Sequence, residues 1–168
     1  MTSLSHHRKK NMSDTSRQRP APWTGFEDIV VGSSFEGFGR TISDAEITMM
    51  TAMTTGFHQP IHTNIEYVRS HTAFTGLLLP GPLIISYAIG LLSATLVYSG
   101  ITIAFVGLDQ VRSKVPAYGG DTLTPTATVR AKKLTSNPPK GIVELDIVVS
   151  KQDGTEVQTF LYTLMVRA

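Results

Sequence analysis

Residues 83–97 constrain the fold more than any other part of the chain. Leucine, isoleucine, valine and alanine lie on all sides of a helix drawn through this segment, so almost no polar face remains. Gly81-Pro82 stands at its start and Ser99-Gly100 just past its end, where proline and glycine favour the first turn and the stop of a helix. A helix that is hydrophobic nearly all round must be enclosed by protein. We therefore expect a buried helix over residues 82–98.

The C-terminal part has the pattern of strands. Four runs rich in β-branched and aromatic residues, at 101–108, 121–134, 141–150 and 157–166, are separated by turn-forming residues. Asp153-Gly154 predicts a tight hairpin between the last two. Ser43-Asp44-Ala45-Glu46 matches a capping box and predicts a helix from Asp44 to about Thr54. Antiparallel strands with one enclosed helix indicate an α+β fold in which a sheet wraps a long central helix.

Charge and length indicate one folded domain after a basic tail. The chain has 168 residues, and residues 1–20 hold five basic side chains against one acidic, whereas the rest holds ten basic and twelve acidic. We expect residues 1–22 to be a disordered tail and residues 23–168 to form the domain. Nucleic acid is not expected as a partner, because the folded part lacks a basic excess. The interrupted apolar segment does not predict a membrane span, and the absence of cysteine fits the cytoplasm.

Three ordered motifs carry a resemblance to a known family. The first contains Thr55, Gly56, Pro60, Ile61, His62 and Asn64; the second contains Phe74, Gly76, Gly81 and Ser86; the third runs from Val115-Pro116 through Gly120-Asp121-Thr122-Leu123. In these motifs residues 23–168 resemble the MaoC-like, (R)-specific enoyl-CoA hydratases and dehydratases, which have the hotdog fold. The resemblance implies a homodimer with its site where two subunits meet, and reversible hydration of an enoyl thioester of coenzyme A or a carrier protein.

The same resemblance implies the roles of individual residues. His62 would be the catalytic acid/base and the Gly81 N–H the donor to the thioester oxyanion. Ser86 would lie near the thioester, and Phe57, His58, Gln59 and Asn64 would contact the substrate. No cofactor is implied beyond the thioester itself. No metal is expected either, because Pro60 separates His58 from His62 and no further ligand motif is present.

The sequence differs from the family pattern at three positions where the family has catalytic or substrate-contacting residues. Phe57 stands at the position of the family's catalytic aspartate, Gln59 at that of an asparagine, and Pro80 at that of a histidine. Either His58 or a water held nearby would then have to replace the carboxylate. Two alternatives stay open: a non-catalytic subunit that binds thioesters, and an acyl-thioester hydrolase, for which Glu66 is the nearest carboxylate.

The residues themselves support part of this interpretation and also allow plainer ones. Hydration needs a group that takes a proton from water, a proton donor at the α-carbon, and donors to the thioester oxygen. A histidine suits proton transfer near neutral pH, and an amide at a helix start suits an oxyanion. The plainer interpretations make His62 a structural hydrogen-bonding residue, Gly81 a turn glycine, Asn64 a helix cap, and Ser86 a helix residue bonded back to the backbone.

Overall fold

The computed structural model describes residues 20–54, 59–136 and 140–168. The predicted basic tail lies almost wholly outside these ranges, and Trp23 is the first buried residue. Along the chain the elements are η1 (Phe26–Asp28), β1 (Ser34–Glu36), β2 (Arg40–Thr41), α1 (Asp44–Met53), α2 (Pro60–Thr63), α3 (Ile65–His71), α4 (Gly81–Ser93), β3 (Thr102–Ser113), β4 (Thr122–Leu134), β5 (Lys140–Ser150) and β6 (Glu156–Arg167).

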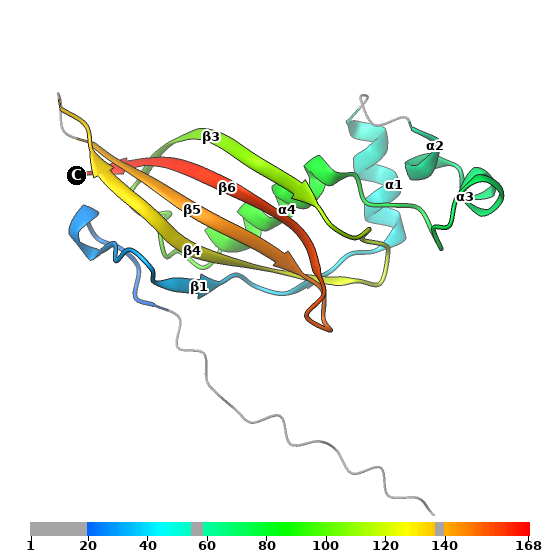
Figure 1. Ribbon diagram of the computed structural model, residues 1–168, viewed down its shortest axis with the longest axis horizontal. Coiled ribbons are helices and arrows are strands. Elements are labelled where there is room, and N and C mark those ends of the chain that lie inside the picture. The colour runs from blue at the N-terminus through cyan, green and yellow to red at the C-terminus, as the bar shows by residue number, and fades with distance from the viewer. Residues whose placement is uncertain (1–19, 55–58, 137–139) are drawn as a thin grey trace, which may run out of the picture.

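The strands form one antiparallel sheet in the order β1-β4-β5-β6-β3, with β2 paired to β4. Helix α4 lies along one face of the sheet, and α1, α2 and α3 gather at one end of the molecule (Figure 1). The predicted hairpin between β5 and β6 is confirmed, because Gly154 has a φ of 87° and Lys151 N–H donates to the Thr155 carbonyl at 2.9 Å. The predicted α+β class is therefore confirmed.

Strand β3 is longer than the sequence predicts. The predicted run ends at residue 108, before the polar residues Asp109 and Gln110, whereas the observed strand continues to Ser113. The continuation passes through an irregularity, with a register shift between Asp109 and Arg112 and a φ of 52° at Gln110. A bulge keeps the strand paired but changes which side chains face each side of the sheet. A search for strict alternation of apolar and polar residues therefore does not predict this part of β3.

Helix α4 is shorter than expected and ends at Ser93 instead of residue 98. Thr95 N–H donates to the Leu92 carbonyl and Leu96 N–H to the Ser93 carbonyl, each at 3.0 Å. These bonds span three residues, and Leu96 has a φ of 65°, so the chain turns out of the helix here. The prediction of a long central helix is thus not confirmed, because the apolar run continues through this turn into the core.

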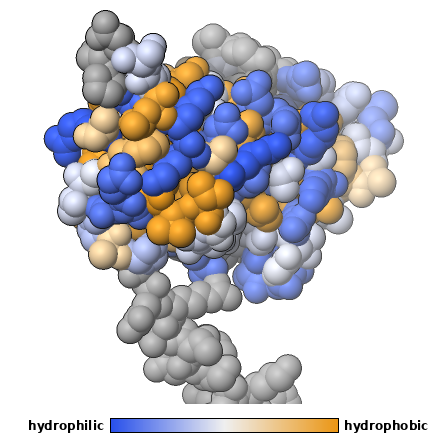
Figure 2. All heavy atoms as spheres, turned by 60° about the vertical axis from the view of Figure 1, so that its left-hand side comes forward, coloured by the Kyte–Doolittle hydropathy of each residue, from blue (hydrophilic) through white to orange (hydrophobic). Residues whose placement is uncertain are grey.

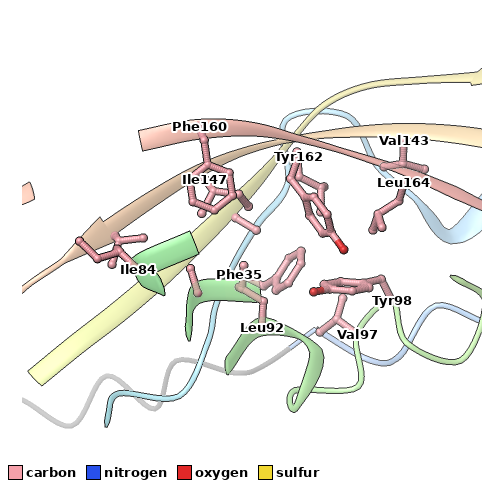
Figure 3. Packing of buried hydrophobic residues seen from close by; sticks show 14 of the residues in the cluster. Phe35, Ile84, Leu92, Val97, Tyr98, Val143, Ile147, Phe160, Tyr162 and Leu164 are labelled. Atoms are coloured by element: carbon pink, nitrogen blue, oxygen red, sulfur yellow. The ribbon is translucent and has the colours of Figure 1, made fainter. Parts of the chain in front are cut away.

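The core lies between α4 and the sheet (Figure 3). Leu83, Ile84, Ala88 and Leu92 are the buried positions of α4, with the spacing of one helical face. Figure 3 shows Ile84 and Leu92 of α4 facing β5 and β6, with Tyr98 and Tyr162 facing each other farther along the core from Ile84. Burial of this face fixes the position of α4, and with it the place of Gly81 at its N-terminus.

One side of α4 and the edge strand β3 of the sheet remain uncovered within one chain. Pro82, Ser86 and Gly90 are exposed along α4, so a single chain does not enclose this helix as the sequence predicts. Strand β3 is an edge of the sheet, and Phe105 and Val106 on it are 57% and 49% exposed. Figure 2 shows apolar patches among the hydrophilic side chains of one face of the molecule. No helix within the described ranges is long and apolar enough to cross a membrane.

Candidate active site

His62 is held by hydrogen bonds between α2 and the segment before α4. Its Nδ1 lies 2.8 Å from the carbonyl oxygen of Leu78, and Leu78 N–H donates to the carbonyl of Ile61 at 3.1 Å. Because a carbonyl only accepts, Nδ1 carries the proton in this contact. The neutral ring then has an unprotonated Nε2, which is the atom that accepts a proton in base catalysis. His62 is 9% exposed, so burial and these bonds fix the ring.

Gly81 lies at the first position of α4, directly after Pro80 and before Pro82. Pro80 starts the helix, since its carbonyl accepts from Leu83 N–H at 2.9 Å and Ile84 N–H at 3.3 Å. Leu79 N–H donates to the Ala117 carbonyl at 2.9 Å, which ties this turn to the segment after β3. Amides in the first turn of a helix have no partner within the helix and lie at the positive end of its dipole.

His62 and Gly81 line the same pocket, which has a volume of about 290 Å³. Its other lining residues are mainly apolar: Phe74, Leu78, Leu79, Ile84, Val115, Pro116 and Ala117, together with Ser113 and Lys114. No carboxylate is among the described lining residues. A mainly apolar pocket with a few convergent polar groups is typical of a small-molecule site.

The other predicted site residues do not join this pair. Ser86 is exposed, and its hydroxyl donates back to the Pro82 carbonyl at 3.2 Å. The Asn64 side chain caps α3 by accepting from Tyr67 N–H at 3.0 Å. Gln59 is exposed at the start of α2 and makes no side-chain capping bond. Phe57 and His58 lie outside the described residues.

Glu66, the carboxylate weighed for thioester hydrolysis, is not among the residues that line the pocket. Its side chain is 77% exposed and pairs with Arg69 at 2.7 Å on the surface of α3. Within the described ranges no three histidine, aspartate or glutamate side chains cluster so that they can hold a metal ion.

Two polar residues here were missed in the sequence: Ser113, which lines the pocket, and Gln158, which is buried behind it. Ser113, at the end of β3, lies opposite Gln158 of β6 in the strand register, and Gln158 Nε2 donates to Ser113 Oγ at 3.0 Å. Gln158 is 1% exposed. It continues a row of alternate core residues, Phe160, Tyr162, Leu164 and Val166. A glutamine in phase with such a row is the signal that identifies it.

A partly buried ion pair lies at the turn that follows the pocket wall. Asp121 accepts from Tyr118 N–H at 2.9 Å and pairs with Lys151 Nζ at 2.7 Å, with both side chains largely shielded. Burial raises the pKa of the Asp121 carboxyl, but the bonds from Lys151 and Tyr118 outweigh this effect, so the net pKa is lowered. These contacts give Asp121 a structural role in the turn.

A second polar cluster holds α4 against α1. The Glu46 carboxylate accepts from Ser43 N–H at 3.0 Å and from the Tyr87 hydroxyl at 3.2 Å, and it also pairs with Arg40. The bond from the Ser43 backbone is the main cause of the lowered pKa of Glu46. Ser43 in turn caps α1 by accepting from Glu46 N–H at 3.1 Å, so the predicted capping box is confirmed.

No family model matches the chain, and no curated protein matches it. Solved structures do. A monoamine oxidase regulatory protein from Archaeoglobus fulgidus is 30% identical with a TM-score of 0.77, over 87% of this chain and 95% of that one. A MaoC-like dehydratase from Rhodospirillum rubrum is 24% identical with a TM-score of 0.73, over 85% of this chain and 96% of that one.

A conserved hypothetical protein from Mycobacterium tuberculosis with a double hotdog fold is 22% identical with a TM-score of 0.75. The alignment covers 86% of this chain and 44% of that one. (R)-hydratases and a ChsH1-ChsH2 complex are among the further matches. The chain therefore has the hotdog fold, in the form found in MaoC-like dehydratases and (R)-hydratases.

Proposed function

We propose that the protein belongs to the MaoC-like family and catalyses the reversible hydration of an enoyl thioester of coenzyme A or a carrier protein. The observation that carries this proposal is the shared pocket of His62 and Gly81. In its neutral form His62 offers a ring nitrogen for the proton transfers, and Gly81 offers an amide at a helix start for the thioester oxygen. The 24% identical MaoC-like dehydratase supports the same reaction class.

His62 alone can balance the proton transfers. In hydration, Nε2 takes a proton from water while the water oxygen bonds to the β-carbon. The C=C electrons move toward the thioester, and the Gly81 N–H stabilises the negative charge on its oxygen. The imidazolium then returns the same proton to the α-carbon, so one water is added and His62 ends neutral. Dehydration is the reverse sequence.

The apolar lining fits the acyl part of such a substrate. Leu79, Ile84, Val115 and Ala117 surround the pocket without offering hydrogen-bonding side chains, so they favour a hydrocarbon chain over a sugar or a nucleotide. Lys114 is a positively charged residue of the lining, and it forms an ion pair with Glu156.

The site is proposed to act in a homodimer joined along β3. Phe105 and Val106 leave apolar surface on a sheet edge, where unpaired backbone groups are ready to pair with another strand. A second copy of the chain would cover these apolar side chains and pair with these backbone groups, because an antiparallel pairing of two identical edge strands is self-complementary.

The two alternatives differ in what supports them. A non-catalytic thioester-binding subunit is favoured by Phe57, which replaces the expected aspartate, and it needs only the pocket. Hydrolysis of the thioester has less support, because Glu66 is committed to the surface pair with Arg69.

The test is hydration of a panel of trans-2-enoyl-CoA thioesters, followed by loss of the conjugated thioester absorbance. We expect hydration by the wild type and a loss of about 10²- to 10⁴-fold in kcat for His62→Ala. His71→Ala is the matched control, because His71 is exposed on α3 and stacks on Tyr67 away from the pocket. Its activity should equal that of the wild type.

Three results would overturn parts of this proposal. Stabilisation of the protein by the same thioesters without hydration would show a binding subunit. Release of free coenzyme A thiol would show a hydrolase. Unchanged hydration in His62→Ala would remove His62 from the mechanism.

A further inference from the structure

Ser113 and Gln158 form a polar pair beside Gly81 that has no role in the proposed proton transfers. Gln158 is 1% exposed, and among the described residues its amide oxygen Oε1 has no hydrogen-bond partner. An amide buried with an unpaired oxygen costs stability, and an apolar residue would extend the core row of β6 without that cost. What the amide does here is hold the Ser113 hydroxyl, by donating from Nε2 to Oγ at 3.0 Å.

The direction of that bond determines what Ser113 can do. Its Oγ accepts from Gln158, so its own O–H proton is free to be donated elsewhere. Ser113 is exposed in the wall of the pocket that His62 and Gly81 also line, and within the described residues no acceptor for its proton is found. The hydroxyl therefore offers a donor to a bound molecule.

Gly81 brings its own donor close to this hydroxyl. A Cβ added at Gly81 would lie 3.3 Å from Gln158 Nε2 and 3.5 Å from Ser113 Oγ. A Cβ is about 2.5 Å from the nitrogen of its own residue, so the Gly81 amide nitrogen lies within about 6 Å of Ser113 Oγ. One oxygen atom can then lie within about 3 Å of both donors. Because glycine has no Cβ, the space between the two donors is left free for that oxygen atom.

We infer that the Ser113 hydroxyl is a second donor to the thioester oxygen, beside the Gly81 N–H, and that Gln158 is a positioning residue that orients it. The inference rests on the proposed thioester chemistry and adds a specific residue pair to it. Two donors aimed at one developing charge stabilise it more than one does, and a buried amide holds the hydroxyl in place before the substrate arrives.

Kinetics of enoyl-CoA hydration test this inference. Ser113→Ala should lower kcat by about 10²-fold with a small change in KM, because the bond strengthens as charge develops on the oxygen. Ser113→Thr keeps the hydroxyl and should restore most of the rate. Gln158→Leu should lower kcat as Ser113→Ala does. Ser34→Ala is the control. Ser34 lies on β1, at the opposite edge of the sheet from β3, and its hydroxyl is hydrogen-bonded to that of Thr128, so this variant should match the wild type.

A second readout separates the inference from the proposed reaction. Butanoyl-CoA labelled with ¹³C at the thioester carbonyl cannot be hydrated, and its carbonyl stretch in the infrared falls when the oxygen accepts hydrogen bonds. The stretch should be lower on the wild type than in solution and should rise in Ser113→Ala. If the wild type shows this shift but hydrates nothing, the inference holds while the proposed reaction fails.

The opposite results overturn the inference. Wild-type hydration with an unchanged kcat and carbonyl stretch in Ser113→Ala would show that Ser113 does not contact the thioester, and the proposed reaction would stand. A wild type that binds butanoyl-CoA without any carbonyl shift would overturn the inference directly. Ser113 is a surface residue of the pocket wall, so this variant folds even if Gln158→Leu does not.

Discussion

Alanine at position 81 probes the helix start and the pocket together, and alanine at position 90 is its matched control. Both glycines lie in α4 and neither has a positive φ, but Gly81 precedes Pro82, whose ring disfavours a Cβ on a preceding helical residue, whereas Gly90 has no such neighbour. Glycine is less favourable than alanine within a helix by about 0.5–1 kcal/mol. At Gly90 nothing lies within 4 Å of the position that a methyl group would take, so Gly90→Ala should gain that stability.

At Gly81, the first residue of α4, the helix gain is smaller than in the helix interior and is opposed by a close contact. The new methyl group would lie 3.3 Å from Gln158 Nε2, so the buried amide must shift by a few tenths of an ångström. Crowding of this kind costs about 1 kcal/mol, which offsets the helix gain. A change of 1 kcal/mol moves Tm by about 2–4 °C in a chain of this size. For a gain of about 0.5–1 kcal/mol we expect Gly90→Ala to raise Tm by about 1–4 °C, and we expect Gly81→Ala to leave Tm within about 2 °C of the wild type.

Activity should separate the two variants further. The methyl group introduced by Gly81→Ala would fill the approach to the backbone N–H at this position and displace the Ser113–Gln158 pair, so kcat for hydration should fall by about 10²-fold. Gly90→Ala should keep wild-type kcat. Differential scanning fluorimetry and the enoyl-CoA assay check both values. Equal gains in Tm with unchanged kcat in both variants would refute the placement of Gly81 against the pair.

Three further outcomes follow from single contacts. Val106→Glu puts a charge on the exposed edge of β3. If the wild type forms the proposed dimer, sedimentation should show that Val106→Glu is a monomer; a Val106→Glu dimer would place the interface elsewhere. Ser43→Ala removes the cap of α1 and should cost about 1 kcal/mol in urea unfolding, whereas an unchanged midpoint would show that the cap contributes nothing. The pKa of Asp121 is lowered in the folded state, so its contribution to stability is present above its unfolded pKa and is lost as pH falls through the folded value. Asp121→Asn should therefore reduce the loss of stability on acidification below about pH 4, and an equally steep loss would refute the assignment.

The elements that the sequence predicts well are those set by local signals. The capping box at Ser43 marks the start of α1 at the observed residue, and Asp153-Gly154 marks the β5–β6 hairpin. These features depend on side chains that bond their own neighbouring backbone, so they can be predicted without knowledge of the rest of the fold. That His62 and Gly81 share a site could be predicted only through the family resemblance. The two residues are nineteen positions apart, and no local sequence signal predicts that such residues lie close together.

The predictions for the end of α4, the length of β3 and Gln158 failed for one physical reason. In each case tertiary contacts determine the structure, and the local sequence pattern does not contain them. The apolar run after Ser93 is core rather than helix, because Val97 and Tyr98 are buried after the turn at Leu96. Strand β3 continues through polar residues because β6 pairs with it beyond the bulge. Gln158 was overlooked for the same reason: its bond to Ser113 exists only when these two strands lie side by side.

The pH dependence of hydration tests whether His62 works alone. No carboxylate lies among the described lining residues, and Phe57 stands at the position where the family that the sequence resembles has an aspartate. An enzyme with separate acid and base groups gives a bell-shaped profile of kcat/KM, with one limb for each group. In the proposed scheme one imidazole takes the proton and returns it, so only its neutral form starts the cycle. The profile should therefore fall on the acidic side alone and stay level on the alkaline side. An alkaline limb that persists in Lys114→Met would show that a second titrating group gives the proton, and His58→Ala would then be the variant that identifies or excludes the neighbouring histidine.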